Sequence, residues 1–262
     1  MMIACLVVCL VIAGAATSQN LSKEFLSVVG RSSYIFSGTV MVMDSSNVII
    51  HSSRKSAIVR VDYVFDAAVE YSLTADKQVT IFFADSSAHT SGKQYVFYTS
   101  VSSVGRTLGL TETRNSLNKK VQPDLKQRIT KARELIADDT LRAQLKRSDL
   151  VVLATVIDPR SDTTKSYRIQ SEHNPAIIGA IIEVKTPLKG HITQQKILVY
   201  YASSDDVLWY RAAKLSKEMD GIFLLHSANK MPIFQLPGYA VLDPRDVQST
   251  DQLKKIQQLL KK

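Results

Sequence analysis

Short apolar runs and alternating stretches recur along the chain and predict a series of β-strands. Val59, Val61 and Tyr63 alternate with polar residues, which is typical of a half-buried strand. Single glycines, among them Gly92 and Gly105, mark the turns between the runs. The pattern predicts five strands in the first half of the chain, at residues 34–43, 57–65, 79–84, 94–100 and 107–113.

Other segments have the period of a helix. Apolar residues recur at helical spacing over 21–29, where Gly30 is placed to end the helix. A second helix opens at Pro123, a residue that suits the first helical turn. Its apolar stripe at i, i+4, i+7 and i+11 consists of Leu125, Ile129, Ala132 and Ile136.

Two further helices are predicted from capping residues. Asp138 or Asp139 is placed to cap a new helix that leads into the strand at Leu150. Near the end of the chain, Ser249 or Thr250 can cap a helix that resembles the one after Pro123.

The second half of the chain repeats the first in the same order, which indicates a duplicated β-rich unit. Each unit includes a leading and a closing helix. The second unit differs by a helical stretch near Asp205–Met219, which contains Trp209, and by a longer first loop, Pro159–Pro175. The repeated strands are residues 34–40 with 150–156, 57–61 with 180–184, and 79–86 with 197–204, at offsets of 116, 123 and 118 residues.

The domain plan follows from the repeat. Residues 1–18 are expected to be a signal peptide, 19–137 the first unit and 138–262 the second. Five or six short strands with flanking helices fit a small Greek-key barrel of the OB type. The predicted fold class is therefore mainly β with flanking helices (α+β), as two tandem OB-like barrels.

Several short motifs are shared with a known family of OB modules: Ser33–Val40, Asp149–Val156, Ala180–Val184 followed by Pro187-Leu188-Lys189-Gly190, Tyr95–Tyr98 after Gly92, and Ile222–Leu225 after Gly221. In these residues each unit resembles the netrin-like, TIMP-like family. This resemblance implies an OB fold and a secreted setting. Inhibitors of that family use an N-terminal cysteine and disulfides, and the mature chain has neither, so zinc-directed inhibition does not follow.

The N-terminal segment predicts export. Ile3–Ala13 is an unbroken apolar run followed by small residues, as in a secretory signal peptide, although an uncleaved anchor is the alternative. The protein is thus expected to be secreted or periplasmic, with no transmembrane helix beyond this segment. Both cysteines, Cys5 and Cys9, lie within it, so a cysteine-free mature chain excludes disulfides, thiolate zinc sites and cysteine nucleophiles. Asn20-Leu21-Ser22 matches the glycosylation acceptor pattern.

The net charge of +9 is concentrated in the predicted helices. Lys119–Ser148 carries 9 basic and 4 acidic residues, and Asp246–Lys262 carries 4 and 2, which together account for +7. The β-rich bodies are nearly neutral. Basic residues on the helix faces are either a solvated surface or contacts for an anionic surface. The candidates in the first basic segment are Lys126, Arg128, Lys131, Arg133 and Arg142.

Asp85, Ser87 and His89 form the densest polar cluster and include the residue types of a nucleophilic triad. The second unit has no histidine there, and a polar loop after a strand explains the cluster equally. The five histidines show no metal-ligand spacing and are interpreted as exposed loop residues, with His226 partly buried. The glycines form no phosphate-binding loop. The sequence therefore predicts no cofactor and no metal.

The aromatic pairs Phe82-Phe83 and Tyr200-Tyr201 allow two interpretations. OB barrels stack bases on strand aromatics, but a core position beside a covered outer face explains each pair equally. Because a groove that follows a nucleic-acid backbone should be basic, the neutral β-bodies predict no specific nucleic acid.

The leading hypothesis is a non-enzymatic binding protein. Its partner would be a protein or an envelope component, which would meet the first-strand loops or the groove between units. Three alternatives stay open: an inhibitor-like module against an extracellular hydrolase that uses the Pro159–Pro175 loop or the new N-terminus, a hydrolase that uses Asp85–His89, and a binder of an anionic polymer or lipid through the basic helices.

Overall fold

The chain divides into two compact units, Met1–Ile136 and Ala137–Lys262, each described here by itself. In the computed structural model, the described residues are 21–48, 55–68, 72–83, 88–104, 108–113, 122–162, 176–203, 209, 212–230 and 236–261.

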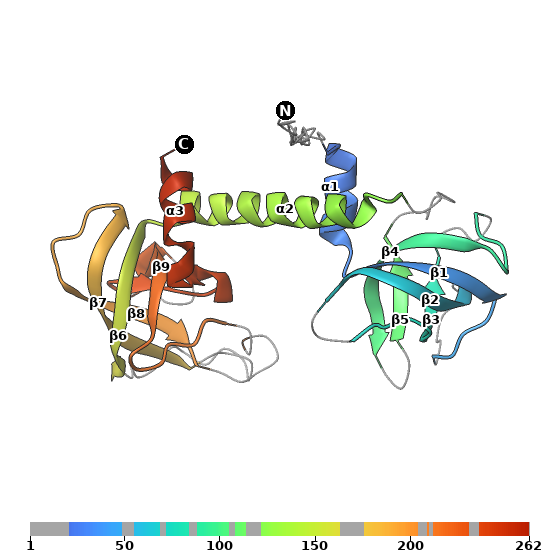
Figure 1. Cartoon of the computed structure of the whole chain (residues 1–262). Coiled ribbons are helices and arrows are strands. Elements are labelled where there is room, and N and C mark those ends of the chain that lie inside the picture. The colour runs from blue at the N-terminus through green and yellow to red at the C-terminus, as the bar shows by residue number, and fades with distance from the viewer. Residues whose placement is uncertain are drawn as a thin grey trace, which may run out of the picture. The chain divides into compact units, whose positions relative to one another are not determined.

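The first unit begins with one helix followed by five strands (Figure 1). Ser22 caps the helix through its hydroxyl, which accepts a hydrogen bond from the backbone N–H of Phe25. Gly30 lies inside the helix rather than ending it, because the helix continues to Arg31 before the chain extends. The five strands are confirmed to within a few residues. The elements are α1 (Lys23–Arg31), β1 (Tyr34–Met43), β2 (Ser56–Ala67), β3 (Gln78–Phe82), β4 (Gln94–Val104) and β5 (Leu108–Glu112).

The five strands close into a barrel in the order β1-β2-β3-β5-β4. The β3–β5 pair is parallel, and the other neighbours are antiparallel. This closed five-stranded arrangement is the OB fold. Alternation along the strands directs one apolar set inward. The buried core of this barrel includes Tyr34, Phe36, Val59, Ile81, Phe97 and Leu110.

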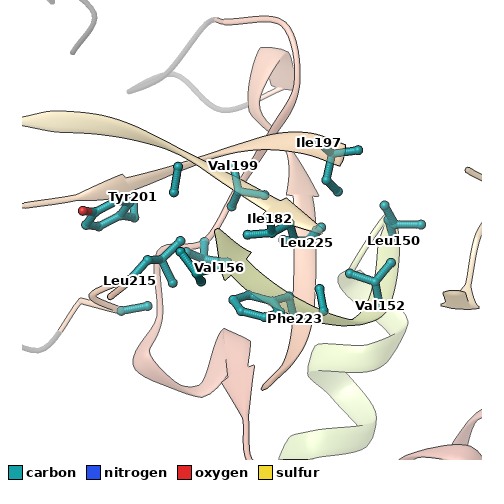
Figure 2. Close-up of a cluster of buried hydrophobic side chains, with 14 residues drawn as sticks. Leu150, Val152, Val156, Ile182, Ile197, Val199, Tyr201, Leu215, Phe223 and Leu225 are labelled. Atoms are coloured by element: carbon teal, nitrogen blue, oxygen red, sulfur yellow. The ribbon is translucent and has the colours of Figure 1, made fainter. Parts of the chain in front are cut away.

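The second unit repeats the barrel. Its strand β10 pairs with both β8 and β9, which closes the ring β6-β7-β8-β10-β9, and β11 adds to β9. Figure 2 shows apolar side chains of four of its strands gathered in the core. The strands are β6 (Leu150–Asp162), β7 (Ile177–Lys189), β8 (Lys196–Ala202), β9 (Asp220–Ser227), β10 (Tyr239–Ala240) and β11 (Val247–Gln248).

The registers of the two barrels agree over most of their paired strands, and in the first strand pair the agreement ends at Val42 and Asp158. Gly38 pairs with Val61 in the first barrel, and Ala154 pairs with Val184 in the second. These positions differ by the offsets of 116 and 123 that the sequence repeat shows. The same agreement holds from β2–β3 to β7–β8 with an offset of 118. From β1–β4 to β6–β9 it holds with an offset of 126 for the fourth strand. The sequence repeat therefore corresponds to two OB-like barrels in the structure.

One continuous helix, α2 (Leu125–Arg147), replaces the two helices predicted on either side of residue 138. Its first half packs with α1 and the first barrel, and its second half packs in the second unit. The apolar stripe changes phase, because a continued stripe would use residue 139 or 140 rather than Leu141. No glycine or proline accompanies that change, so the helix does not break. Asp138 caps no helix and instead pairs with Lys255.

Two predictions in the second unit are wrong in extent. β6 continues to Asp162, so Pro159 belongs to a strand and not to the following loop. The described residues of the stretch Asp205–Met219 contain no helix, because Ala213 and Leu215 enter the barrel core instead. The remaining elements are η1 (Ala228–Lys230), η2 (Pro244–Asp246), η3 (Thr250–Gln252) and α3 (Leu253–Leu260).

The chain end forms as expected. Ser249 caps η3, which leads directly into α3, and Ile256 of α3 is buried. The expected signal peptide and Asn20 lie outside the described residues. Among the helices that the structure describes, none is both long and apolar enough to cross a membrane.

Candidate functional site

The polar cluster after β3 is only partly covered by the structure. Asp85 and Ser87 lie outside the described residues. His89 is buried, which corrects the interpretation of it as an exposed loop histidine. Its imidazole lies among aromatic residues of the first barrel core rather than in solvent.

Aromatic rings surround the imidazole of His89. The Phe83 ring stacks on it with ring centroids 4.3 Å apart, and Tyr95 and Phe97 lie at 4.8 and 5.9 Å. The Tyr95 hydroxyl accepts a hydrogen bond of 3.0 Å from the backbone N–H of Thr90. This bond holds the loop over the histidine, so the strands β3, β4 and their connection all position one imidazole.

The carboxylate of Glu112 completes the cluster from β5. Its Oε1 lies 3.4 Å from Nε2 of His89, and the two side chains are 1% and 0% exposed. A histidine beside a carboxylate can act in proton transfer only if a substrate comes within hydrogen-bonding reach. Because the barrel encloses both side chains, a substrate cannot come within that reach. Within the described ranges, no group of three potential ligands gathers to hold a metal ion.

The second barrel has apolar residues at both positions. The loop before the fourth strand also follows the offset of 126, because the N–H of Gly92 donates to Val40 and the N–H of Glu218 donates to Val156. Leu215 therefore occupies the place of His89. Val241 occupies the place of Glu112, one residue beyond the parallel pair that β10 forms with β8. Leu215 and Val241 are both buried in the second core. The polar pair is thus specific to the first barrel and is not a requirement of the fold.

The basic candidates of α2 form no common binding surface. Arg133 donates from Nε and Nη2 to Asp66 at 2.9 and 2.5 Å, and from Nη2 to the carbonyl oxygen of Ser32 at 2.6 Å. Arg128 stacks over the Phe25 ring at 4.9 Å. Arg133 therefore fastens α2 to β2 and the end of α1, and Arg128 packs against α1.

The other three candidates are exposed. Lys126 lies 5.9 Å from the ring centroid of Tyr63, and Lys131 pairs with Glu134 at 3.1 Å. Lys126 and Lys131 line a shallow hollow on the helix surface. Arg142 pairs with its neighbour Asp139 at 3.0 Å. Pairs of this kind on an exposed helix stabilise by only a few tenths of a kcal/mol.

Two of the other histidines and both aromatic pairs lie among the described residues. His191 is exposed, and His226 is half-buried with Nε2 3.4 Å from Asp246. His51 and His173 lie outside the described residues. In each aromatic pair the second ring, Phe83 or Tyr201, enters a barrel core. The first ring of each pair is also buried, so the interpretation as core plus covered outer face is confirmed.

An apolar feature at the end of β1 was not recognised in the sequence. Met41 and Val42 are 41% and 49% exposed, although both belong to a strand. The repeat contained the signal, because the position of Val42 corresponds to the charged residue Asp158 in the second barrel. Val42 pairs with Ile58 and Asp158 pairs with Ile181, and these two partners are equivalent in the repeat.

Comparison with known proteins adds little to these observations. Neither a protein-family model nor a curated protein matches the sequence. Among solved structures, the Ifi202 HINa domain in complex with 20-bp double-stranded DNA is similar at 10% identity and a TM-score of 0.22, over 80% of this chain and 92% of that chain. A structure described as the molecular basis for abrogation of activation of pro-inflammatory cytokines is similar at 9% identity and a TM-score of 0.22, over 80% and 89%. The fold assignment rests on the strand order and register.

Proposed function

We propose that this protein is a non-enzymatic binding protein whose first barrel contacts a protein partner through the end of β1. The exposed pair Met41 and Val42 carries the proposal. Apolar side chains that gather on a surface mark interaction sites, whereas single exposed apolar residues are ordinary. The corresponding positions of the second barrel hold Ile157, which is half-buried, and Asp158. The barrel fold therefore does not require this apolar surface.

Three observations bear on the alternatives. The enclosed His89–Glu112 pair favours a structural role over hydrolysis. The contacts of Arg133 with β2 and of Arg128 with α1 favour a structural role over anionic-surface binding. The inhibitor hypothesis rests on a loop whose residues 163–175 lie outside the described part of the chain.

The surface can be tested by quantitative affinity capture from an extract of the source organism with residues 19–262 as bait. We expect proteins that the wild type retains to be lost with Val42→Asp, which installs the residue of the second barrel. Leu135→Asp is the matched control, because Leu135 is an exposed apolar residue on α2, 37% exposed. Recovery of the same proteins by wild type and Val42→Asp would remove this surface from the proposal.

We also propose that the protein is exported and takes no specific nucleic acid. The apolar run Ile3–Ala13 and the nearly neutral barrels support these statements. N-terminal sequencing of the expressed protein checks the first, and an intact Met1 would contradict it. Titration of a fluorescent DNA duplex at low and physiological salt checks the second. Saturable binding that persists at physiological salt and depends on the base sequence would contradict it.

A further inference from the structure

Strand β1 is longer than its neighbour β4, which leaves part of it at an edge. On the β4 side, the last paired residue of β1 is Thr39, opposite Gln94. Val40 still exchanges hydrogen bonds with the backbone of Gly92 and Lys93, at 2.8 and 3.0 Å. On the β2 side, pairing continues to Met43.

The exposed edge is therefore the segment Met41–Met43. No strand of the described residues pairs with it on the β4 side. The contact recorded there is a hydrogen bond of 2.8 Å from the Ser91 hydroxyl to the carbonyl oxygen of Met41. A closed barrel has no free strand edge where neighbouring strands overlap. Met41–Met43 extends beyond the overlap with β4, so it is an edge strand.

The same edge of the second barrel is blocked by its own residues. Pro159 has no backbone N–H, and its carbonyl oxygen accepts a hydrogen bond of 3.0 Å from the Tyr201 hydroxyl. The N–H of Arg160 donates to the carboxylate of Asp158 at 3.0 Å. Proline and charged residues are the common means by which proteins protect edge strands from pairing with another chain.

Two of these residues have apolar counterparts in the first barrel. The register of β6 becomes irregular after Asp158, where Pro159 follows, whereas the residue after Val42 in β1 is Met43, which has a backbone N–H. The offsets of 116 and 118 place Val42 at the position of Asp158. They also place Phe83, which has no hydroxyl, at the position of Tyr201. The two barrels thus differ at Val42 and Asp158 and at Phe83 and Tyr201, and β1 has no proline where β6 has Pro159.

We infer that the β1 edge, Met41–Met43, accepts an extended segment of a partner protein that adds to the first barrel by strand pairing. This inference rests on the proposed function and specifies how its site recognises a partner. Main-chain hydrogen bonds would supply affinity, and the exposed side chains of Met41 and Val42 would select apolar residues in the segment. Asp44 follows the edge at one end, and Lys93 bonds to Val40 at the other end. A segment with a basic residue near Asp44 and an acidic residue near Lys93 is therefore favoured.

The occupant is a partner segment rather than a second copy of this chain. Asp44 adopts a left-handed φ of 52°, which ends the strand. Two copies could therefore pair over only three residues. Such a contact would bury far less than the roughly 800 Å² per partner of a stable interface. A free segment can continue past the edge onto the barrel surface.

A random peptide library displayed on phage, selected on residues 19–262, tests the inference. We expect enriched peptides with alternating apolar residues that lose at least about tenfold in affinity, or 1.4 kcal/mol, for Val42→Asp. Val42→Lys should act alike, which excludes repulsion by Asp44 as the cause, and Leu135→Asp should bind normally. Bound peptide should also slow hydrogen exchange of the Met41–Met43 amides, which side-chain contact alone would not do.

The possible failures are distinguishable. An unenriched library, peptides that bind Val42→Asp equally, or binding without slower exchange at Met41–Met43 would each overturn strand addition. Wild-type self-association that Val42→Asp abolishes would assign the edge to a second copy and also overturn it. If capture from the extract depends on Val42 while the exchange does not change, the proposed function stands and only the pairing mode fails.

Discussion

Arg133 Nη2 donates a hydrogen bond of 2.6 Å to the carbonyl oxygen of Ser32, at the C-terminal end of α1. Lys189 Nζ makes the corresponding bond, of 2.5 Å, to the carbonyl oxygen of Ser148 at the end of α2. The two serines differ by the offset of 116, and each also donates its hydroxyl to the carbonyl four residues earlier. A cation beside the last carbonyls of a helix is stabilising, and here two different elements provide it.

Replacing Lys189 by methionine should destabilise the second unit. The substitution keeps the apolar stem and removes the ammonium donor from the carbonyl oxygens of Leu145 and Ser148. Hydrogen bonds to charged groups contribute about 1.5–3 kcal/mol, so we expect a loss of that order in urea unfolding. Lys196→Met, at an exposed position of β8, is the control and should change little. Equal losses for the two variants would show that Lys189 is not a helix cap.

Glu218→Gly should stabilise the protein. Gly92 and Glu218 occupy equivalent turns and have φ values of 77° and 64°, so a non-glycine residue holds a left-handed conformation in the second unit. Relief of that conformation should raise the free energy of unfolding by about 1 kcal/mol.

The reverse change is the matched control for this turn. Gly92→Ala should cost about 1 kcal/mol, although an added Cβ would meet no atom within 4 Å. Urea unfolding measures both variants. A destabilised Glu218→Gly would mean that the glutamate side chain contributes more than its backbone costs.

The buried pair of the first barrel should show strong coupling. Glu112→Val alone leaves the His89 imidazole enclosed without the carboxylate, and a buried polar group left unsatisfied costs about 1–3 kcal/mol. His89→Leu together with Glu112→Val installs the apolar pair of the second barrel. We expect this double variant to recover most of the loss, because apolar replacement of both partners is commonly neutral or better.

A double-mutant cycle in urea measures that coupling energy. The cycle includes His89→Leu as the second single variant. Additive losses in the double variant would show that His89 and Glu112 act independently in the core.

Asp149 should give the second unit an acid-sensitive stabilisation. The hydrogen bond from Lys230 Nζ, at 2.8 Å, and then the N–H of Ser227, at 2.8 Å, hold the pKa of Asp149 below its ordinary value of 3.8. Because the folded-state pKa is the lower one, the stabilisation is present above pH 3.8. It is lost as the pH falls through the folded-state pKa.

Asp149→Asn should therefore be less stable than the wild type near neutral pH, by an amount that shrinks below pH 3.8. Urea midpoints of the two proteins across this range check the expectation. Lys230→Met should reduce the difference, since it removes the largest cause of the pKa shift. A difference that stays constant with pH would exclude the carboxylate charge as its source.

Most of the fold could be predicted from the sequence repeat, because equivalent strands of the two barrels pair in equivalent registers. Residues 34–40 and 150–156 are apolar runs at a constant spacing, and their partners lie at matching registers. Other features depended on tertiary contacts that local pattern does not encode. Asp138 or Asp139 was expected to cap a new helix, whereas α2 is continuous and two different cores cover its two halves.

The candidate site was harder to predict for the same reason. His89 lies among serines and threonines, which is the composition of an exposed loop. Its burial follows from the return of that loop into the barrel and could be inferred only from Leu215, an apolar residue at the repeated position. The Met41–Met43 edge likewise becomes visible only when β1 and β6 are compared residue by residue.

The unbroken helix α2 has a consequence for how the two units can be separated. The boundary between Ile136 and Ala137 falls inside its hydrogen-bonded backbone rather than in a loop. A cut there would create two new helix ends, each with four backbone groups that have lost their partners. A folded fragment of either unit must therefore retain turns that belong to the other, and a protease would find no natural cleavage point between them.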